Sequence, residues 1–124
     1  MLENLAQLDR VLSEAHKAIR RSNIRQAYTS LQDAHIPYCG QPFVTKFLYF
    51  AGLGCGVDHF PLILDTRVMH SLQGLLGTNA PAVGELDDYL KYVDLLHEWA
   101  EMLDCRADSI EYLLFLTPKE FWQV

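Results

Sequence analysis

Apolar residues along this chain recur at steps of three and four positions, in segments separated by prolines and glycines. That spacing places apolar side chains on one face of an α-helix, whereas a half-buried strand would need strict alternation. No pair of strand patterns joined by a tight turn, no internal repeat and no low-complexity tract accompanies it. The sequence therefore predicts an all-α fold, with a single helical domain of about six helices over residues 1–124.

Length and composition fit one packed core. The chain has 124 residues, of which 50% are hydrophobic and 21% charged. A chain of this size can be stabilised by its hydrophobic core without disulfide bonds or a structural metal. No apolar run reaches the roughly 18 residues of a membrane span, and the N-terminus lacks the apolar block of a secretory signal. An odd number of cysteines, three, favours a reduced cytoplasmic protein.

The charge distribution limits how the chain could meet nucleic acid. A net charge of −6 argues against indiscriminate binding, because phosphate contacts supply most of that affinity. Residues 1–67 hold seven Lys or Arg against six Asp or Glu, whereas residues 68–124 hold three against ten. A polyanion should therefore meet the N-terminal part of the chain.

The helices are predicted over residues 2–20, from Ser22 or Asn23 to about 31, 43–51, 66–76, 85–104 and from about 108, with a last turn reaching 122. Two prolines and a glycine within residues 35–42 indicate a tight hairpin, which gives a helix-hairpin-helix over about 23–51. Pro42 suits the first position of the third helix, and the glycines 52, 54 and 56 should end it. The fifth helix should bury a stripe of apolar positions and one histidine: Leu86, Leu90, Val93, His97 and Ala100.

Lys46 is the unusual residue of the third helix, because large apolar side chains flank it on both sides. Its stem could run along the core while its amine reaches water. Alternatively, the amine is partly desolvated and acts as a nucleophile, which requires a carboxylate nearby. Asp65 is the candidate partner, and it is also the expected N-cap of the fourth helix. The two roles of Asp65 are compatible, since capping fixes the direction of an ionised carboxylate.

These features together resemble the helix-hairpin-helix DNA glycosylases, most closely the 8-oxoguanine glycosylase branch and its short bacterial OGG-fold members. The shared pattern is a Pro/Gly hairpin, a helix with a lysine near its start and an aspartate capping the next helix. The segments that carry the resemblance are Ala27-Tyr28 to Leu31, Phe43-Val-Thr-Lys-Phe-Leu-Tyr-Phe-Ala51, Pro61-Leu-Ile-Leu-Asp-Thr-Arg-Val68, Tyr89-Leu-Lys-Tyr-Val93 to Trp99-Ala100, and Glu111-Tyr-Leu-Leu-Phe115.

The resemblance implies excision of an oxidised purine of the 8-oxoguanine type from DNA. Lys46 matches the nucleophile that attacks C1′ of a flipped-out nucleoside, forms a Schiff base and permits strand cleavage by β-elimination. Asp65 matches the carboxylate that stabilises positive charge at the sugar and helps to deprotonate the amine. The candidate nucleic-acid-binding residues lie in a basic cluster, in the hairpin and third helix, and beside Asp65: Arg20, Arg21 and Arg25; Gly40, Gln41 and Thr45; and Arg67.

Three alternatives remain open from the sequence. The chain could be a non-catalytic helical module that binds a protein partner or nucleic acid. A second copy or a protein partner could complete the cleft. A zinc site could be drawn from Cys39, Cys55, His35 and His59, but the paired spacing of zinc ligands is missing, so we expect no metal and no other cofactor.

Overall fold

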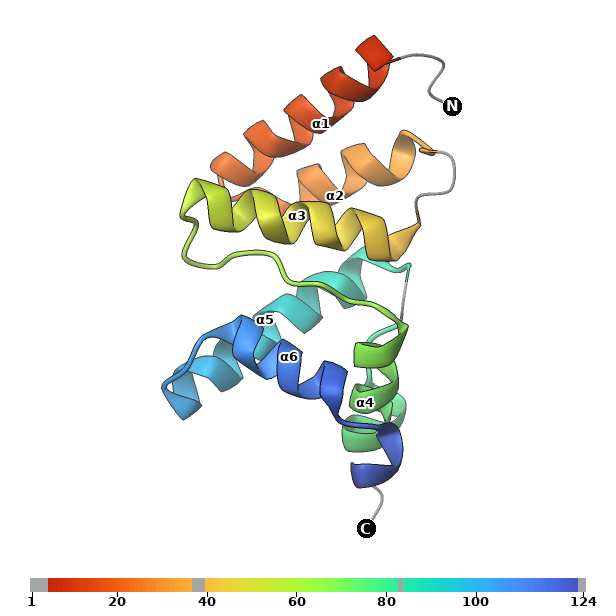
Figure 1. The fold of residues 1–124 in the computed structure, drawn as a ribbon, viewed down its shortest axis with the longest axis vertical. Helices are drawn as coiled ribbons and strands as arrows, with labels where there is room; N and C mark the ends of the chain where they lie inside the picture. The colour runs from red at the N-terminus through yellow and green to blue at the C-terminus, as the bar shows by residue number, and fades with distance from the viewer. Residues whose placement is uncertain (1–4, 37–39, 83, 123–124) are drawn as a thin grey trace. The chain divides into compact units, whose positions relative to one another are not determined.

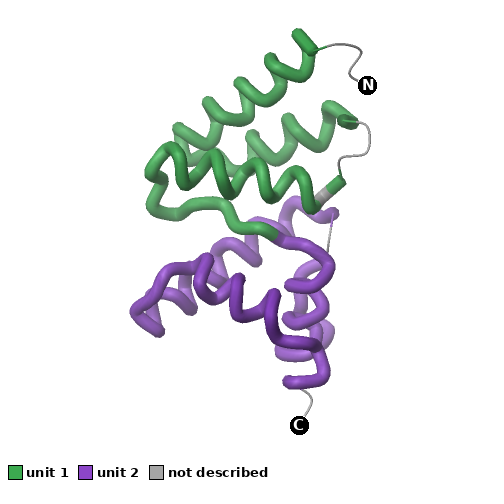
Figure 2. Tube along the Cα trace, in the orientation of Figure 1, with its two compact units in different colours: residues 1–63 green, residues 64–124 purple. Residues whose placement is uncertain are grey.

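The computed structural model of the chain describes residues 5–36, 40–82 and 84–122, and in these ranges it is all-α, without a β-strand (Figure 1). The chain divides into two compact units, residues 1–63 and 64–124, and each is described by itself (Figure 2). The all-α prediction is confirmed, whereas the single domain over residues 1–124 stays a prediction. Within the described ranges, no helix combines the length and the apolar character of a membrane span.

The described part of unit 1 contains three helices that pack against one another, α1 (Leu5–Arg20), α2 (Ile24–Asp33) and α3 (Gln41–Cys55). The predicted cap of α2 is confirmed, since the Asn23 side chain accepts a hydrogen bond from the Gln26 backbone N–H at 3.1 Å. One face of α2 is buried, through Ile24, Ala27, Tyr28 and Leu31. The buried hydrophobic residues of this unit are Ala15, Ala18, Ile19, Ile24, Ala27, Tyr28, Leu31, Val44, Leu48 and Leu62.

The third helix extends beyond the end predicted from the positions of its glycines. It continues through Gly52 and Gly54 to Cys55, and Gly56 caps it with a φ of +68°, the left-handed conformation common at helix C-termini. Gly52 is needed for close packing, because a Cβ there would lie 2.6 Å from Cδ of Pro61. The expected end at residue 51 was therefore wrong, since the first glycine serves packing and only the last one terminates the helix.

The hairpin itself falls on residues 37–39, which lie outside the described residues. The flanking helices α2 and α3 are in place and pack on each other. The helix-hairpin-helix over about 23–51 accordingly stays a prediction.

Unit 2 contains α4 (Thr66–Leu76), α5 (Leu86–Leu103), α6 (Ala107–Leu116) and two short 3₁₀ segments, η1 (Gly77–Asn79) and η2 (Lys119–Trp122). Helix α6 packs against both α4 and α5, and η2 packs on α4. Residues 61–65 have no regular structure, as predicted for the approach to Asp65. The last predicted turn is confirmed as η2.

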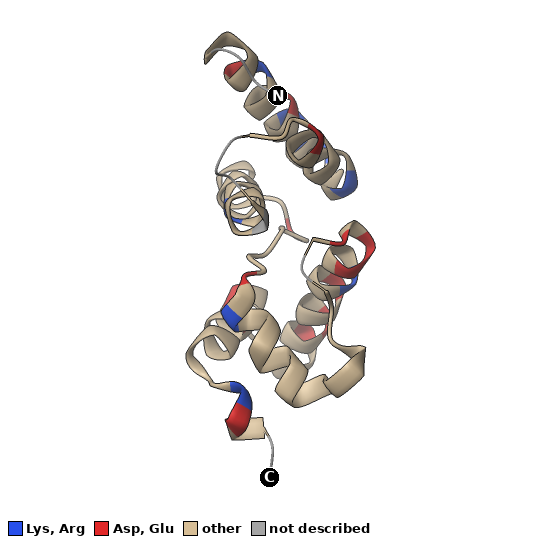
Figure 3. Ribbon diagram, turned by 90° about the vertical axis from the view of Figure 1, so that its right-hand side faces the viewer, with Lys and Arg blue, Asp and Glu red and all other residues tan. Residues whose placement is uncertain are grey.

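The apolar stripe of α5 differs from its prediction. The residues buried on α5 are Tyr89, Tyr92, Val93, Leu96 and Ala100, whereas Leu86, Leu90 and His97 are only half-buried. Two tyrosines thus supply core volume that the prediction gave to leucine. Helix α5 also carries five of the eleven acidic residues of unit 2: Asp87, Asp88, Asp94, Glu98 and Glu101 (Figure 3).

Candidate functional site

Lys46 lies on the exposed side of α3. Val44, Thr45 and Leu48 are buried, whereas Lys46 and Phe50 are exposed, with Phe50 at 64% of its maximum. The two exposed residues are four positions apart and therefore share one face of the helix. The amine thus meets solvent, as in the first of the two alternatives considered for it. Desolvation of this amine would require a ligand that covers the exposed face of α3.

Asp65 caps α4 as predicted. Its Oδ1 accepts a hydrogen bond from the Val68 backbone N–H at 2.9 Å, and the side chain is half-buried. Asp65 follows the buried Leu64 and precedes the exposed Thr66, so it stands where the chain passes from the core to the surface. The cap gives the carboxylate a fixed direction and leaves its second oxygen for another interaction.

Two residues near Asp65 were given no role by the sequence prediction. Tyr92 is 1% exposed, and burial raises the pKa of its phenol well above the usual value. The charge of Glu111, the neighbouring Tyr89 and then the charge of Asp65 raise this pKa further. Asp65 and Glu111 therefore act on one buried phenol, which stays protonated at neutral pH. The only sequence signal was that these positions fall in segments shared with the glycosylases.

Lys46 and Asp65 belong to different units, residues 1–63 and 64–124. Each side chain has the local setting described above: an exposed amine on α3 and an oriented carboxylate at the start of α4. Their pairing in one catalytic centre stays a prediction.

The predicted phosphate-binding residues at the start of α3 have unequal exposure. Gly40 is exposed, adopts an extended conformation and accepts hydrogen bonds from the backbone N–H groups of Phe43 and Val44. Gln41 is the first residue of the helix, and its side chain lies outside the described parts. Thr45 is fully buried, with its hydroxyl oxygen 3.5 Å from the Pro42 carbonyl oxygen. The structure therefore gives a nucleic-acid strand no access to the Thr45 side chain.

The basic cluster lies where α1 ends and α2 begins. Arg20, Arg21 and Arg25 are all exposed, and Nε of Arg21 donates a hydrogen bond to the Lys17 carbonyl oxygen at 3.3 Å. This contact places a cation at the C-terminal end of α1, where the helix dipole favours positive charge. Arg21 thus serves as a helix cap, and all three side chains lie on the surface of unit 1.

Arg67 lies in the first turn of α4, two residues after Asp65. Its guanidinium sits over the Phe115 ring, 4.4 Å from the ring centroid, and the residue is exposed. Stacking uses the face of the guanidinium and leaves its N–H edges as donors.

The zinc site considered from the sequence has no counterpart among the described residues. Cys39 is outside the described residues, and within the described ranges no three His, Cys, Asp or Glu side chains are grouped as a metal site. Cys55 instead lies beside His16 of α1, with 3.5 Å between Sγ and Nε2. Sequence spacing gave no signal for this contact between α1 and α3.

A family model with the description "Putative 8-oxoguanine DNA glycosylase OGG-like protein" matches residues 1–115. No curated protein and no solved structure matches the chain. The family match covers every helix from α1 to α5 and nearly all of α6, together with both candidate catalytic residues. The chain therefore belongs to this OGG-like family.

Proposed function

We propose that the protein is a DNA glycosylase and β-lyase that excises an oxidised purine of the 8-oxoguanine type. The observation that carries the proposal is Asp65, a half-buried carboxylate whose direction is fixed by the Val68 N–H, within a chain of the OGG-like family. Lys46 supports it as a surface amine on the helix that the family resemblance marks for the nucleophile.

The reaction begins with the neutral Lys46 amine, which attacks C1′ of the flipped nucleoside. The bond between C1′ and the base breaks, and the base leaves with the bonding electron pair and takes up a proton. Asp65 accepts a proton from the attacking amine and stabilises the positive charge that develops at C1′. Ring opening gives a Schiff base between Nζ and C1′, and loss of a C2′ proton then expels the 3′ phosphate by β-elimination.

Exposure of Lys46 in the free protein sets a requirement for this mechanism. A bound DNA strand would have to cover the amine and exclude water, because a desolvated amine holds its proton less tightly. The exposed apolar neighbours Phe50 and Leu53 on α3 fit such a covered site. Arg20, Arg25 and the exposed Gly40 are the remaining candidate DNA contacts of unit 1, and Arg67 is the candidate in unit 2.

Borohydride trapping tests the proposal. The protein is incubated with duplexes containing 8-oxoguanine or an abasic site, together with the variants Lys46→Gln, Asp65→Asn and Lys91→Gln. Lys91 is an exposed lysine of α5 and serves as the matched control. We expect a covalent adduct that Lys46→Gln abolishes, that Asp65→Asn reduces by about 10²–10⁴-fold in rate, and that Lys91→Gln leaves intact.

The alternative function is a non-catalytic module that binds a protein or nucleic acid. An adduct that survives Lys46→Gln would contradict the assigned nucleophile. No adduct on either duplex, from a protein with its full helical circular dichroism, would contradict the glycosylase and favour the module or an enzyme completed by a second copy or partner. A cytoplasmic location also stays a prediction.

A further inference from the structure

A surface hollow of about 330 Å³ lies in unit 2 between α4 and the segment that follows α6. Two contacts hold this segment on α4. The indole N–H of Trp122 donates a hydrogen bond to the hydroxyl of the buried Ser71 at 2.8 Å. Gly74 lets the Lys119 backbone approach α4 more closely than any side chain at position 74 would permit. The walls of the hollow are therefore built by specific packing, and its 117–120 wall lies beyond the residues that match the family.

The charge around this hollow is opposite to that of the rest of unit 2. Residues 64–124 contain four Lys or Arg against eleven Asp or Glu. Arg106 is paired with Asp108 at 2.9 Å, and Lys91 lies on the acidic helix α5. The other two cations, Arg67 and Lys119, both line the hollow, and no carboxylate among the described residues forms an ion pair with either. Among the described residues that line the hollow, Glu120 is the one carboxylate.

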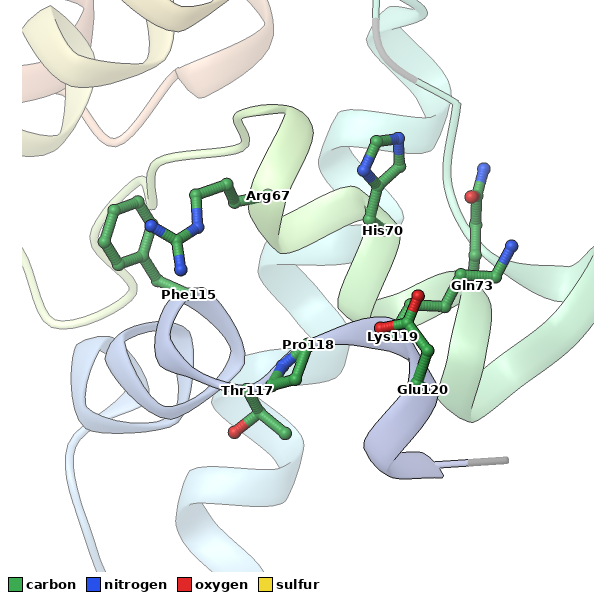
Figure 4. Close-up of a pocket in the computed structure, with 8 residues that line it drawn as sticks. All are labelled: Arg67, His70, Gln73, Phe115, Thr117, Pro118, Lys119 and Glu120. Carbon is green, nitrogen blue, oxygen red and sulfur yellow. The ribbon is translucent and has the colours of Figure 1, made fainter. Parts of the chain in front are cut away.

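The two cations lie on different sides of the hollow. In Figure 4 the Arg67 guanidinium lies against Phe115, whereas the Lys119 side chain extends towards Gln73. His70 projects from α4 between them and, with the Gln73 amide, adds hydrogen-bonding groups that carry no negative charge. A single small anion would engage one of these cations, whereas an extended polyanion could engage both.

We propose that this hollow binds the phosphate backbone of a nucleic-acid strand, with Arg67 and Lys119 contacting separate phosphates. Arg67 offers the edges of a guanidinium already held by Phe115, which suits the planar geometry of phosphate oxygens. Lys119 adds a second positive charge from outside the family-matched residues. The inference rests on the proposed function only in taking nucleic acid as the ligand, and it needs no excision chemistry.

The test is binding of an undamaged, fluorescently labelled DNA duplex, measured by anisotropy over a series of salt concentrations. Each phosphate contact contributes about 0.9 to the slope of log K against log salt. We expect Lys119→Gln and Arg67→Gln each to lower the slope by about 1 and to weaken binding about three- to tenfold at low salt. Lys91→Gln makes the same charge change on the same unit outside the hollow and should leave the slope unchanged. Glu120→Gln should strengthen binding.

Unchanged slopes in both Lys119→Gln and Arg67→Gln would overturn the site, as would an equal loss in Lys91→Gln. Inorganic phosphate and a nucleoside monophosphate form a separate arm of the test. The hollow would instead be a site for a free phosphate ester if the protein binds the nucleotide saturably, Lys119→Gln abolishes that binding, and the protein does not bind DNA. That result would overturn the proposal of a nucleic-acid strand as the ligand. If borohydride trapping fails but both variants lower the salt slope as expected, the proposed enzyme activity is contradicted and this site is not. If trapping succeeds but neither variant changes the salt slope, this site is contradicted and the enzyme activity is not.

Discussion

Substitution of Gly74 by alanine tests how the end of the chain is held on α4. Gly74 lies inside α4, where alanine favours an isolated helix by about 1 kcal/mol. In the folded chain, the new Cβ would collide with the carbonyl oxygen of Lys119 and lie 3.1 Å from its Cγ. The obstructing atom belongs to the backbone, so a side-chain rotation cannot relieve the collision and η2 must move.

The expected balance is a loss of stability. Overpacking of this kind costs about 1–3 kcal/mol. Movement of η2 also strains the hydrogen bond from Trp122 to Ser71. If this bond breaks, the Ser71 hydroxyl is buried without a partner, which lowers the free energy of unfolding by about 1–3 kcal/mol. Against the helix gain of about 1 kcal/mol, we expect Gly74→Ala to lower the free energy of unfolding by about 1–3 kcal/mol.

The assay is thermal and urea unfolding followed by circular dichroism and tryptophan fluorescence. Gly54→Ala is the matched control, because position 54 is also helical but has no other atom within 4 Å of the added Cβ. We expect Gly54→Ala to raise the Tm by a few degrees and Gly74→Ala to lower it, at about 4 °C per kcal/mol. Equal increases in both variants would refute the close approach of Lys119 to α4.

Three further predictions concern single side chains. Asp65→Ala should destabilise the fold by about 1 kcal/mol in urea unfolding, whereas Asp65→Asn, which can still accept the Val68 hydrogen bond, should cost less than half of that; equal losses would contradict the cap. Lys46→Gln should change the free energy of unfolding by less than about 0.5 kcal/mol, because Lys46 is exposed, and a larger loss would contradict that placement. Folding raises the pKa of Tyr92, so above about pH 10 the unfolded chain releases a proton that the folded chain keeps, and stability should fall by up to about 1.4 kcal/mol per pH unit. Tyr92→Phe should remove this dependence in urea unfolding at pH 8–11, whereas Tyr112→Phe, at a residue 63% exposed, should not.

Much of the fold was predictable because its signals are local. Asn23 and Asp65 both cap helices, as their positions before apolar segments predicted. The end of α3 was not predictable, because a glycine that permits close packing and one that ends a helix look alike in sequence. The glycine at position 52 is needed because Pro61, on the loop after α3, packs against it. The glycine at position 56 is needed because its φ is positive.

The candidate site shows the same division between local and long-range information. The direction of Asp65 follows from its own turn, so sequence reasoning could find it. Burial of Thr45 depends on which side of α3 faces the unit 1 core, and a helix apolar on most sides does not specify this. Docking of Trp122 on Ser71 joins residues 51 positions apart, so no periodicity could indicate the hollow beside α4.

Asp65 shows why stability and activity must be measured on the same variants. One carboxylate serves both as the cap of α4 and as the proposed acceptor of the Lys46 proton, so loss of activity in Asp65→Ala could reflect a frayed helix. Asparagine separates the two roles, because its amide oxygen can keep the hydrogen bond from Val68 while it carries no charge and accepts a proton poorly. A stable Asp65→Asn protein that binds DNA with the wild-type salt slope, yet traps no adduct, would assign the lost activity to the missing charge. Full trapping by the same protein would restrict Asp65 to its structural role.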